Sequence, residues 1–205
     1  MLFKSRRRRL VLLLMMRCAL TVSEIVHLTL SSVQAHAGSP EEVSEWLALA
    51  GLPLLQPKSA PGTSLPGHPA PALGASTYSL QLFGPRPVQA RQLLLDSHTC
   101  EALADWLDVR TTGNVGPDDR LIVGSARGTA ITPMGLYGIC QAHMAGCLEG
   151  YDDIAQMGPN TLRNTCITLW LNQGVALPEI LRRCGLKDAE LLIRLQRHLL
   201  PAGML

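Results

Sequence analysis

A single arginine stands where a short loop enters an apolar helix toward the C-terminal end of the sequence. Arg163 lies in the stretch GPNTLRNTCITLWLNQG, which begins at Gly158. A guanidinium carries a permanent positive charge and five donors, so it suits a phosphate or a carboxylate. Arg163 is therefore a candidate active-site residue. The other interpretation is structural, with the side chain paired to Asp152 or Asp153 or donating to backbone carbonyls.

Further basic residues follow on the next predicted helix. Arg182, Arg183 and Lys187 could form a phosphate-facing surface, or they could be a solvated helix end, where cations are also favourable. The formal net charge is only +2, although Arg6 to Arg9 are contiguous. Charge alone therefore does not argue for a nucleic-acid-binding protein.

The six cysteines form no CxxC pair, and several fall in apolar helical stretches. This pattern suits reduced, buried thiols in the cytoplasm better than a disulfide framework. Cys140, His143 and Cys147 could share a helix face and suggest a metal, but no fourth ligand is evident. We therefore expect neither a metal nor another cofactor.

The composition favours one domain with a sizeable aliphatic core. The chain has 205 residues, of which 47% are apolar, 17% charged and 4% aromatic. A basic stretch and an apolar run open the sequence, as in an export signal. The run stops at Arg17, and Glu24 and His27 follow, which makes it too short for a signal or a membrane span. We expect a buried helix and a cytoplasmic protein without membrane contact.

The periodic patterns predict a mainly α fold with a small antiparallel β-sheet (α+β). Two strands are expected around the turn GPRPVQA, and residues 118–124 read as a short strand or extended segment. The proline-rich residues 51–77 cannot build a regular element and are expected to be a flexible insertion, either a spacer or a proline-motif ligand. The predicted helices span residues 8–20, a segment capped by Ser23, residues 40–50, a segment capped by Ser97, a segment capped by Thr132, and two closing helices.

Several segments together resemble the catalytic domain of the tyrosine recombinases, the phage-integrase family. CALTVSEIVHL, from Cys18 to Leu28, resembles the family's TGLRVSEL junction. The segment from Asn160 to Leu186 resembles its HxLRHTFAT…LGH segment. LQLFGPRPVQARQLLLD stands where the family has its GKGxKxRxVPL hairpin, and residues 118–143 match the stretch between. The resemblance implies a single integrase-like catalytic domain over residues 1–205, without the family's N-terminal core-binding domain.

The resemblance also implies a chemistry, which this chain matches only in part. In the family a tyrosine attacks a DNA phosphodiester, while arginines, histidine-type residues and a lysine stabilise the phosphate and move protons. Leu195 stands at the position of the tyrosine, and only Arg163 is retained among the matched catalytic residues. The other substituted positions are those of Thr21 (first arginine), Asn160 (first histidine) and Leu186 (second histidine), with Arg86 close to the place of the lysine.

The expected function is therefore that of an integrase-like DNA-binding protein without strand cleavage in cis. Arg163, Arg86, Arg182 and Arg183 are the predicted phosphate contacts, and binding should be weak and salt-sensitive, with Kd of about 10⁻⁴ to 10⁻⁶ M. Alternative hypotheses are a recombinase subunit whose partner supplies the tyrosine, a protein-interaction module, and a decayed gene product. An active tyrosine recombinase is a possible partner. Other tyrosines are poor substitutes for the nucleophile, and we expect Tyr137 to lie in the core.

Overall fold

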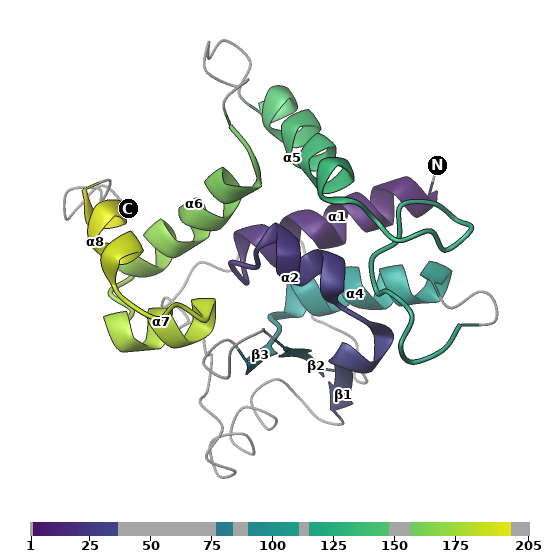
Figure 1. Ribbon diagram of the computed structural model, residues 1–205, viewed down its shortest axis with the longest axis horizontal. Helices are drawn as coiled ribbons and strands as arrows, with labels where there is room; N and C mark the ends of the chain where they lie inside the picture. The colour runs from purple at the N-terminus through teal and green to yellow at the C-terminus, as the bar shows by residue number, and fades with distance from the viewer. Residues whose placement is uncertain (1, 37–76, 84–89, 111–114, 148–156, 198–205) are drawn as a thin grey trace, which may run out of the picture.

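The computed structural model describes residues 2–36, 77–83, 90–110, 115–147 and 157–197 (Figure 1). Several sequence predictions lie outside these residues. They are the helix at 40–50, residues 51–76 of the proline-rich insertion, Arg86, and the acids at 152 and 153.

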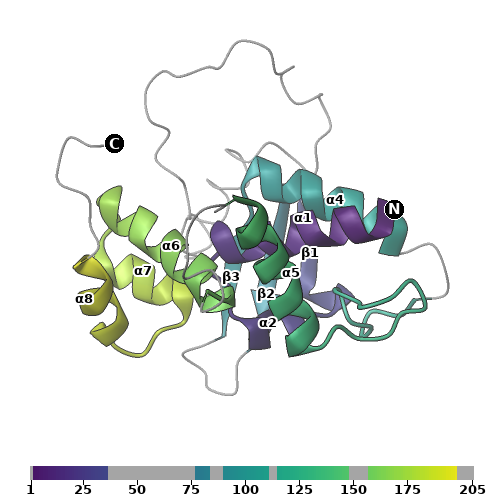
Figure 2. The same ribbon diagram turned by 90° about the horizontal axis from the view of Figure 1, so that it is seen from above.

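Helix α1 (Leu2–Met16) lies between α4 (Ser97–Arg110) and α5 (Pro133–Cys147) in both ribbon views (Figures 1 and 2). It begins several residues before the predicted start, but its second half is buried as expected. Leu10, Val11 and Leu14 have no exposed surface. Burial of aliphatic side chains on this scale is the main stabilising contribution to the fold.

The basic run on α1 holds neighbouring elements in place. Arg9 forms ion pairs of 3.2 Å with Glu101 and 3.0 Å with Asp105, both on α4. Arg6 donates to the Asp105 carbonyl at 2.8 Å, and Arg7 donates to the Val123 carbonyl at 3.1 Å. The guanidinium groups of these three arginines therefore bond to other parts of the protein.

Strands β1 (Val33–His36), β2 (Thr77–Leu82) and β3 (Arg91–Leu94) form an antiparallel sheet in that order. Leu80 of β2 pairs with Val33 and Leu93, and alternate residues of β2 and β3 point into the core. The two predicted strands are confirmed, whereas β1 was not predicted. Residues 118–124 are not a strand, but they pair through isolated bridges, including one between Val123 and Ala130.

The helix caps correct two predictions and confirm one. Thr21, rather than Ser23, is the N-cap of α2 (Val22–His27). Asp96, rather than Ser97, caps α4, because its carboxylate accepts from the backbone amide of residue 99 at 3.0 Å. The Thr132 hydroxyl accepts from the amide of residue 135 at 3.0 Å, so α5 begins where the sequence predicted.

The C-terminal part has α6 (Pro159–Asn172), α7 (Leu177–Cys184) and α8 (Glu190–Gln196), where two helices were predicted. They gather at one end of the molecule around a second hydrophobic cluster (Figures 1 and 2). Gly185 ends α7 with a φ of 61°, a conformation that glycine adopts without strain. The turn before α2 lies at the border between this cluster and the main core, because Ala19 belongs to the second cluster and Leu20 to the first.

Candidate functional site

Arg163 lies on the inner side of α6 and is 7% exposed. Its Nε donates to the Ala19 carbonyl at 2.9 Å, and its Nη2 donates to the Cys184 carbonyl at 3.5 Å. Cys184 is the last residue of α7, so its carbonyl has no acceptor role within that helix and carries the partial negative charge of the helix end. Arg163 thus joins α6 to both the turn before α2 and the end of α7.

The turn that receives Arg163 has an unusual backbone. Ala19 has a φ of 51°, in the left-handed region that residues with a Cβ atom rarely adopt, and it is fully buried. Such a conformation is maintained only where the surroundings determine it. The hydrogen bond from Arg163 is one of the contacts that do so here.

Thr21 and Glu24 form a capping box at the start of α2. The Thr21 hydroxyl accepts from the Glu24 amide at 3.2 Å, and Glu24 Oε2 accepts from the Thr21 amide at 2.8 Å. The side chain of Thr21 is therefore engaged in starting the helix.

Arg91 was not singled out by the sequence pattern, yet it is central to this region. Its side chain is 4% exposed and forms a 2.6 Å ion pair with Glu24. Its Nε donates to the Arg183 carbonyl at 2.7 Å. The signal in the sequence is a cation at an inward-facing position of a short strand, two residues before the buried Leu93. Arg91 and Arg163 therefore donate to consecutive carbonyls at the end of α7.

Arg182 and Arg183 are both held by one carboxylate of their own helix. Glu179 accepts from Arg182 at 2.8 Å through each of its oxygens, and from Arg183 Nε at 2.9 Å. The Arg183 guanidinium also lies 5.1 Å above the Trp170 ring. Burial would raise the pKa of Glu179, but hydrogen bonds and charges from the two arginines outweigh it and lower that pKa.

Comparison with solved structures identifies the arrangement. No protein-family model and no curated protein matches the sequence. The alignment with the crystal structure of XerA recombinase covers 98% of this chain and 53% of the XerA chain. The sequence identity is 14% and the TM-score is 0.59. The second structure is the XerH site-specific recombinase in a pre-cleavage complex with its difH substrate. The alignment covers 94% of this chain and 43% of the XerH chain, with 18% sequence identity and a TM-score of 0.59.

This chain has the tyrosine recombinase catalytic-domain fold. The structure of the Tn1549 transposon integrase, solved with transposon right-end DNA, is also similar. The alignment covers 97% of this chain and 56% of the integrase chain, with 12% sequence identity and a TM-score of 0.52. The chain spans about half the length of the solved recombinases that it matches. The predicted fold class and the family resemblance are confirmed at the level of the fold.

The structure describes the residues that the resemblance places at catalytic positions, which are Thr21, Asn160, Arg163, Leu186 and Leu195. Leu195 is 9% exposed and packs in the second hydrophobic cluster, against which Leu186 also packs. Asn160 is exposed in the first turn of α6. Together with the capping role of Thr21, these placements put apolar packing and helix capping at positions where the resemblance expects polar catalytic groups.

The two described tyrosines, Tyr137 and Tyr78, lie on α5 and β2, whereas Leu195 lies on α8. Tyr137 was predicted to lie in the core, but it is exposed on α5, and its hydroxyl accepts from Gln141 at 3.0 Å. Its ring lies against Gly158, where an added Cβ atom would be 2.8 Å from the ring. Tyr78 is half-buried against the main core. Tyr151 lies outside the described residues.

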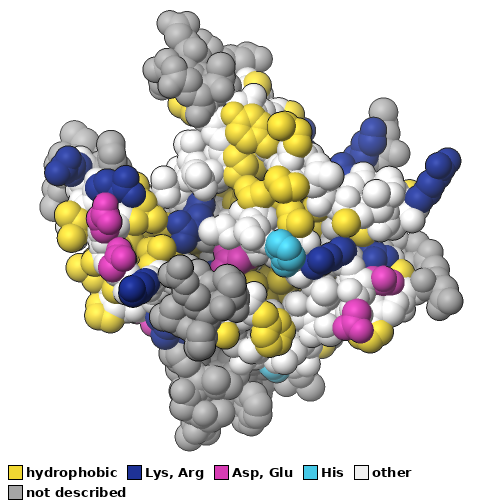
Figure 3. All heavy atoms as spheres, viewed as in Figure 1, with side chains coloured by type: hydrophobic (Ala, Val, Ile, Leu, Met, Phe, Trp, Pro, Cys, Tyr) yellow, Lys and Arg dark blue, Asp and Glu magenta, His cyan; other side chains and the backbone are white. Residues whose placement is uncertain are grey.

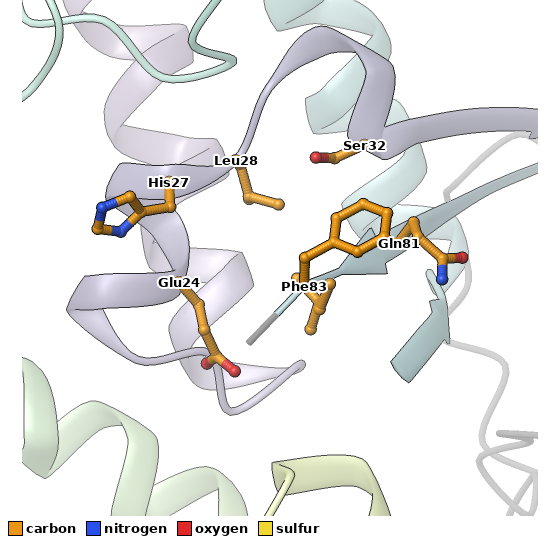
Figure 4. A pocket seen from close by; sticks show the side chains of 7 residues that line it. Glu24, His27, Leu28, Ser32, Gln81 and Phe83 are labelled. Atoms are coloured by element: carbon orange, nitrogen blue, oxygen red, sulfur yellow. The ribbon is translucent and has the colours of Figure 1, made fainter. Parts of the chain in front are cut away.

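A small pocket lies between α2 and the end of β2 (Figure 4). Its volume of about 30 Å³ holds about one water molecule, far less than a small-molecule site needs. Glu24 and His27 border it on one side and Gln81 and Phe83 on the other. It is therefore a crevice near the Arg91–Glu24 pair rather than a substrate pocket.

The cysteines show how the cores are packed. Cys140 is buried with its Sγ 3.4 Å from the Met15 sulfur, whereas Cys147 is exposed, 3.9 Å from the His143 ring nitrogens. Burial raises the pKa of Cys166 to about 12.

Among the described residues, no three His, Cys, Asp or Glu side chains are grouped so that they could hold a metal ion. None of the described helices is long and apolar enough to cross a membrane.

Proposed function

We propose that this protein binds duplex DNA through the recombinase fold without cleaving it. The observation that carries this proposal is the place of Leu195, a side chain without a nucleophile, inside the second hydrophobic cluster. Thr21 at the position that the resemblance assigns to an arginine supports it further, since loss of one preorganised donor typically costs about a hundredfold or more in rate.

Arg163 is the residue through which we propose that a DNA phosphate is held. Its hydrogen bonds to described residues use Nε and Nη2, which leaves Nη1 for a further acceptor. Its bonds to described residues are to carbonyls, so its positive charge is not neutralised there by a carboxylate. Because only a few cations would take part, we expect weak binding that falls steeply with salt.

Fluorescence anisotropy of a labelled mixed-sequence duplex at low salt tests the DNA contact. Arg163→Gln should weaken binding severalfold. Arg110→Gln is the matched control, because Arg110 is also buried and also donates to a carbonyl, that of Arg120, at 2.9 and 3.1 Å. Circular dichroism establishes that both variants fold. Equal affinity in the two variants, or no binding by the native protein, would refute the contact.

A suicide DNA substrate tests the absence of cleavage. No covalent protein–DNA adduct should form with this protein alone. An adduct would contradict the proposal, and its loss in Tyr137→Phe would identify Tyr137 as the nucleophile.

A second candidate function is contact with another protein, and α5 is the observation that favours it. Its 15 residues include no Asp, Glu, Lys or Arg, and Met134 is 76% exposed. In the space-filling view, hydrophobic side chains gather over α5 while Lys and Arg lie scattered (Figure 3). An active tyrosine recombinase is the partner we propose for this face.

The rate of strand cleavage by an active recombinase, with and without this protein, tests that partner. Any change in rate should disappear with Met134→Glu and persist with Leu2→Glu, which alters an exposed apolar residue on α1. An unchanged rate in every mixture would rule out this partnership.

A further inference from the structure

Arg182 and Arg183 are bound by Glu179 in the geometry with which arginines bind phosphate. Arg182 presents Nε and Nη2 to the two carboxylate oxygens, each at 2.8 Å, and Arg183 adds a third bond at 2.9 Å. A planar fork of this kind serves carboxylate and phosphate equally well. The carboxylate thus occupies the place that a phosphodiester group would take.

The electrostatics of this cluster leave it attractive to an anion. One carboxylate faces two guanidinium groups, and the lowered pKa of Glu179 keeps that carboxylate charged at neutral pH. The Arg182 and Glu179 side chains are 28% and 25% exposed, so an incoming anion can reach the pair. Partly exposed ion pairs of this kind contribute little to stability, and they exchange readily.

The position of Arg183 is fixed by more than the carboxylate. Its guanidinium lies over the Trp170 ring, and its carbonyl accepts from Arg91. Removal of the Glu179 charge would therefore leave Arg183 oriented, with its charge available to another anion.

We propose that Glu179 is a built-in competitor that occupies the arginines of α7 and limits their binding to DNA phosphates. This inference rests on the proposed function, because it names how phosphate binding at α7 is restrained. DNA binding then requires a phosphodiester group to displace the Glu179 carboxylate from Arg182. The restraint is a physical reason to expect weak binding from a protein whose α7 carries two adjacent arginines.

Anisotropy titrations of a labelled duplex over a range of salt concentrations test the proposal with Glu179→Gln. Glu101→Gln is the matched control, because Glu101 also pairs with an arginine, Arg9, at 3.2 Å on a different helix. Each variant raises the formal net charge of +2 by one. Glu179→Gln should bind about two- to fivefold more tightly than the control. Its salt dependence should steepen by about 0.9 per added phosphate contact.

The double variant Glu179→Gln with Arg182→Gln should lose the gain. Equal affinities of Glu179→Gln and Glu101→Gln would overturn the inference while leaving DNA binding intact. Binding by Glu179→Gln alone would support the competitor role and refute DNA binding by the native protein. No binding by any form would overturn both.

A measurement on the native protein keeps the test independent of folding in the variants. The pKa of the Glu179 carboxyl, followed by NMR, should rise when DNA saturates the protein, because the arginines that lower it are then engaged elsewhere. Glu101 is the reference for the general effect of a nearby polyanion. An equal rise in both pKa values would overturn the inference.

Discussion

At the scale of single residues, the positions that the resemblance assigns to catalysis hold side chains with other roles in this fold. Thr21 caps a helix, Leu195 fills a hydrophobic cluster, and Arg163 bonds to carbonyls. Each placement is favourable for folding. These residues therefore contribute to stability in ways that substitution experiments can separate from DNA binding.

Ala19→Val tests the strained turn beneath Arg163. A β-branched side chain at a φ of 51° in a fully buried turn should lower the free energy of unfolding by roughly 2 to 3 kcal/mol. Urea denaturation measures the loss. Ala142→Val on the exposed side of α5 should cost less than about 1 kcal/mol. Similar losses in the two variants would mean that the turn is not strained.

Leu195→Tyr tests whether a nucleophile alone would restore cleavage. We expect no covalent adduct on a suicide substrate, because Thr21 and Leu186 supply neither the charge nor the proton transfer. The larger ring in a packed cluster should also lower the free energy of unfolding by about 1 to 3 kcal/mol. An adduct formed by this single variant would show that the remaining groups still support catalysis.

At the scale of elements, two buried arginines attach the C-terminal helices to the rest of the fold. Arg91 connects β3 to α2 through Glu24 and to α7 through the Arg183 carbonyl. Arg163 connects α6 to Ala19 and to the Cys184 carbonyl. Both guanidinium groups face the carbonyl end of α7, where the helix dipole favours positive charge.

Arg91→Leu should break this attachment. Loss of one partner of a buried ion pair leaves Glu24 uncompensated, and we expect a cost of about 3 to 5 kcal/mol. Amide hydrogen exchange should show the greatest loss of protection in α7. Arg17→Leu removes a 2.8 Å pair with Asp96 at the surface and should cost about 0 to 1 kcal/mol. Equal costs would mean that the buried pair contributes no more than the surface pair.

At the scale of the whole molecule, the core is divided between two hydrophobic clusters. The larger one joins α1, α2, the sheet, α4, α5 and Leu162 of α6. The smaller one joins α6, α7, α8 and Ala19. Buried cysteines lie in both, with Cys18, Cys100 and Cys140 in the first and Cys166 and Cys184 in the second.

Alkylation by iodoacetamide reports on both clusters at once. Cys147 is the exposed thiol and should react first, whereas the buried thiols should react only when their cluster opens. Mass spectrometry over time distinguishes the sites. Labelling of Cys166 as early as Cys147 would show that the second cluster does not exclude the reagent.

The sequence by itself determined the fold class, two strands and the start of α5, and it fixed which side chains stand at the positions that the resemblance assigns to catalysis. Such features depend on local patterns, for example apolar periodicity and the Thr132–Pro133 cap. Leu195 lacks a hydroxyl whatever its surroundings.

The tertiary structure alone decided the partners of the arginines. Arg163 donates to the Ala19 carbonyl although the two residues are 144 positions apart in the sequence. Arg91 and Arg183, which also share a hydrogen bond, are 92 positions apart. No local pattern encodes contacts at such separations, because they form only when the two clusters pack together. For the same reason β1, whose partner strand begins at Thr77, was not evident from its own four residues.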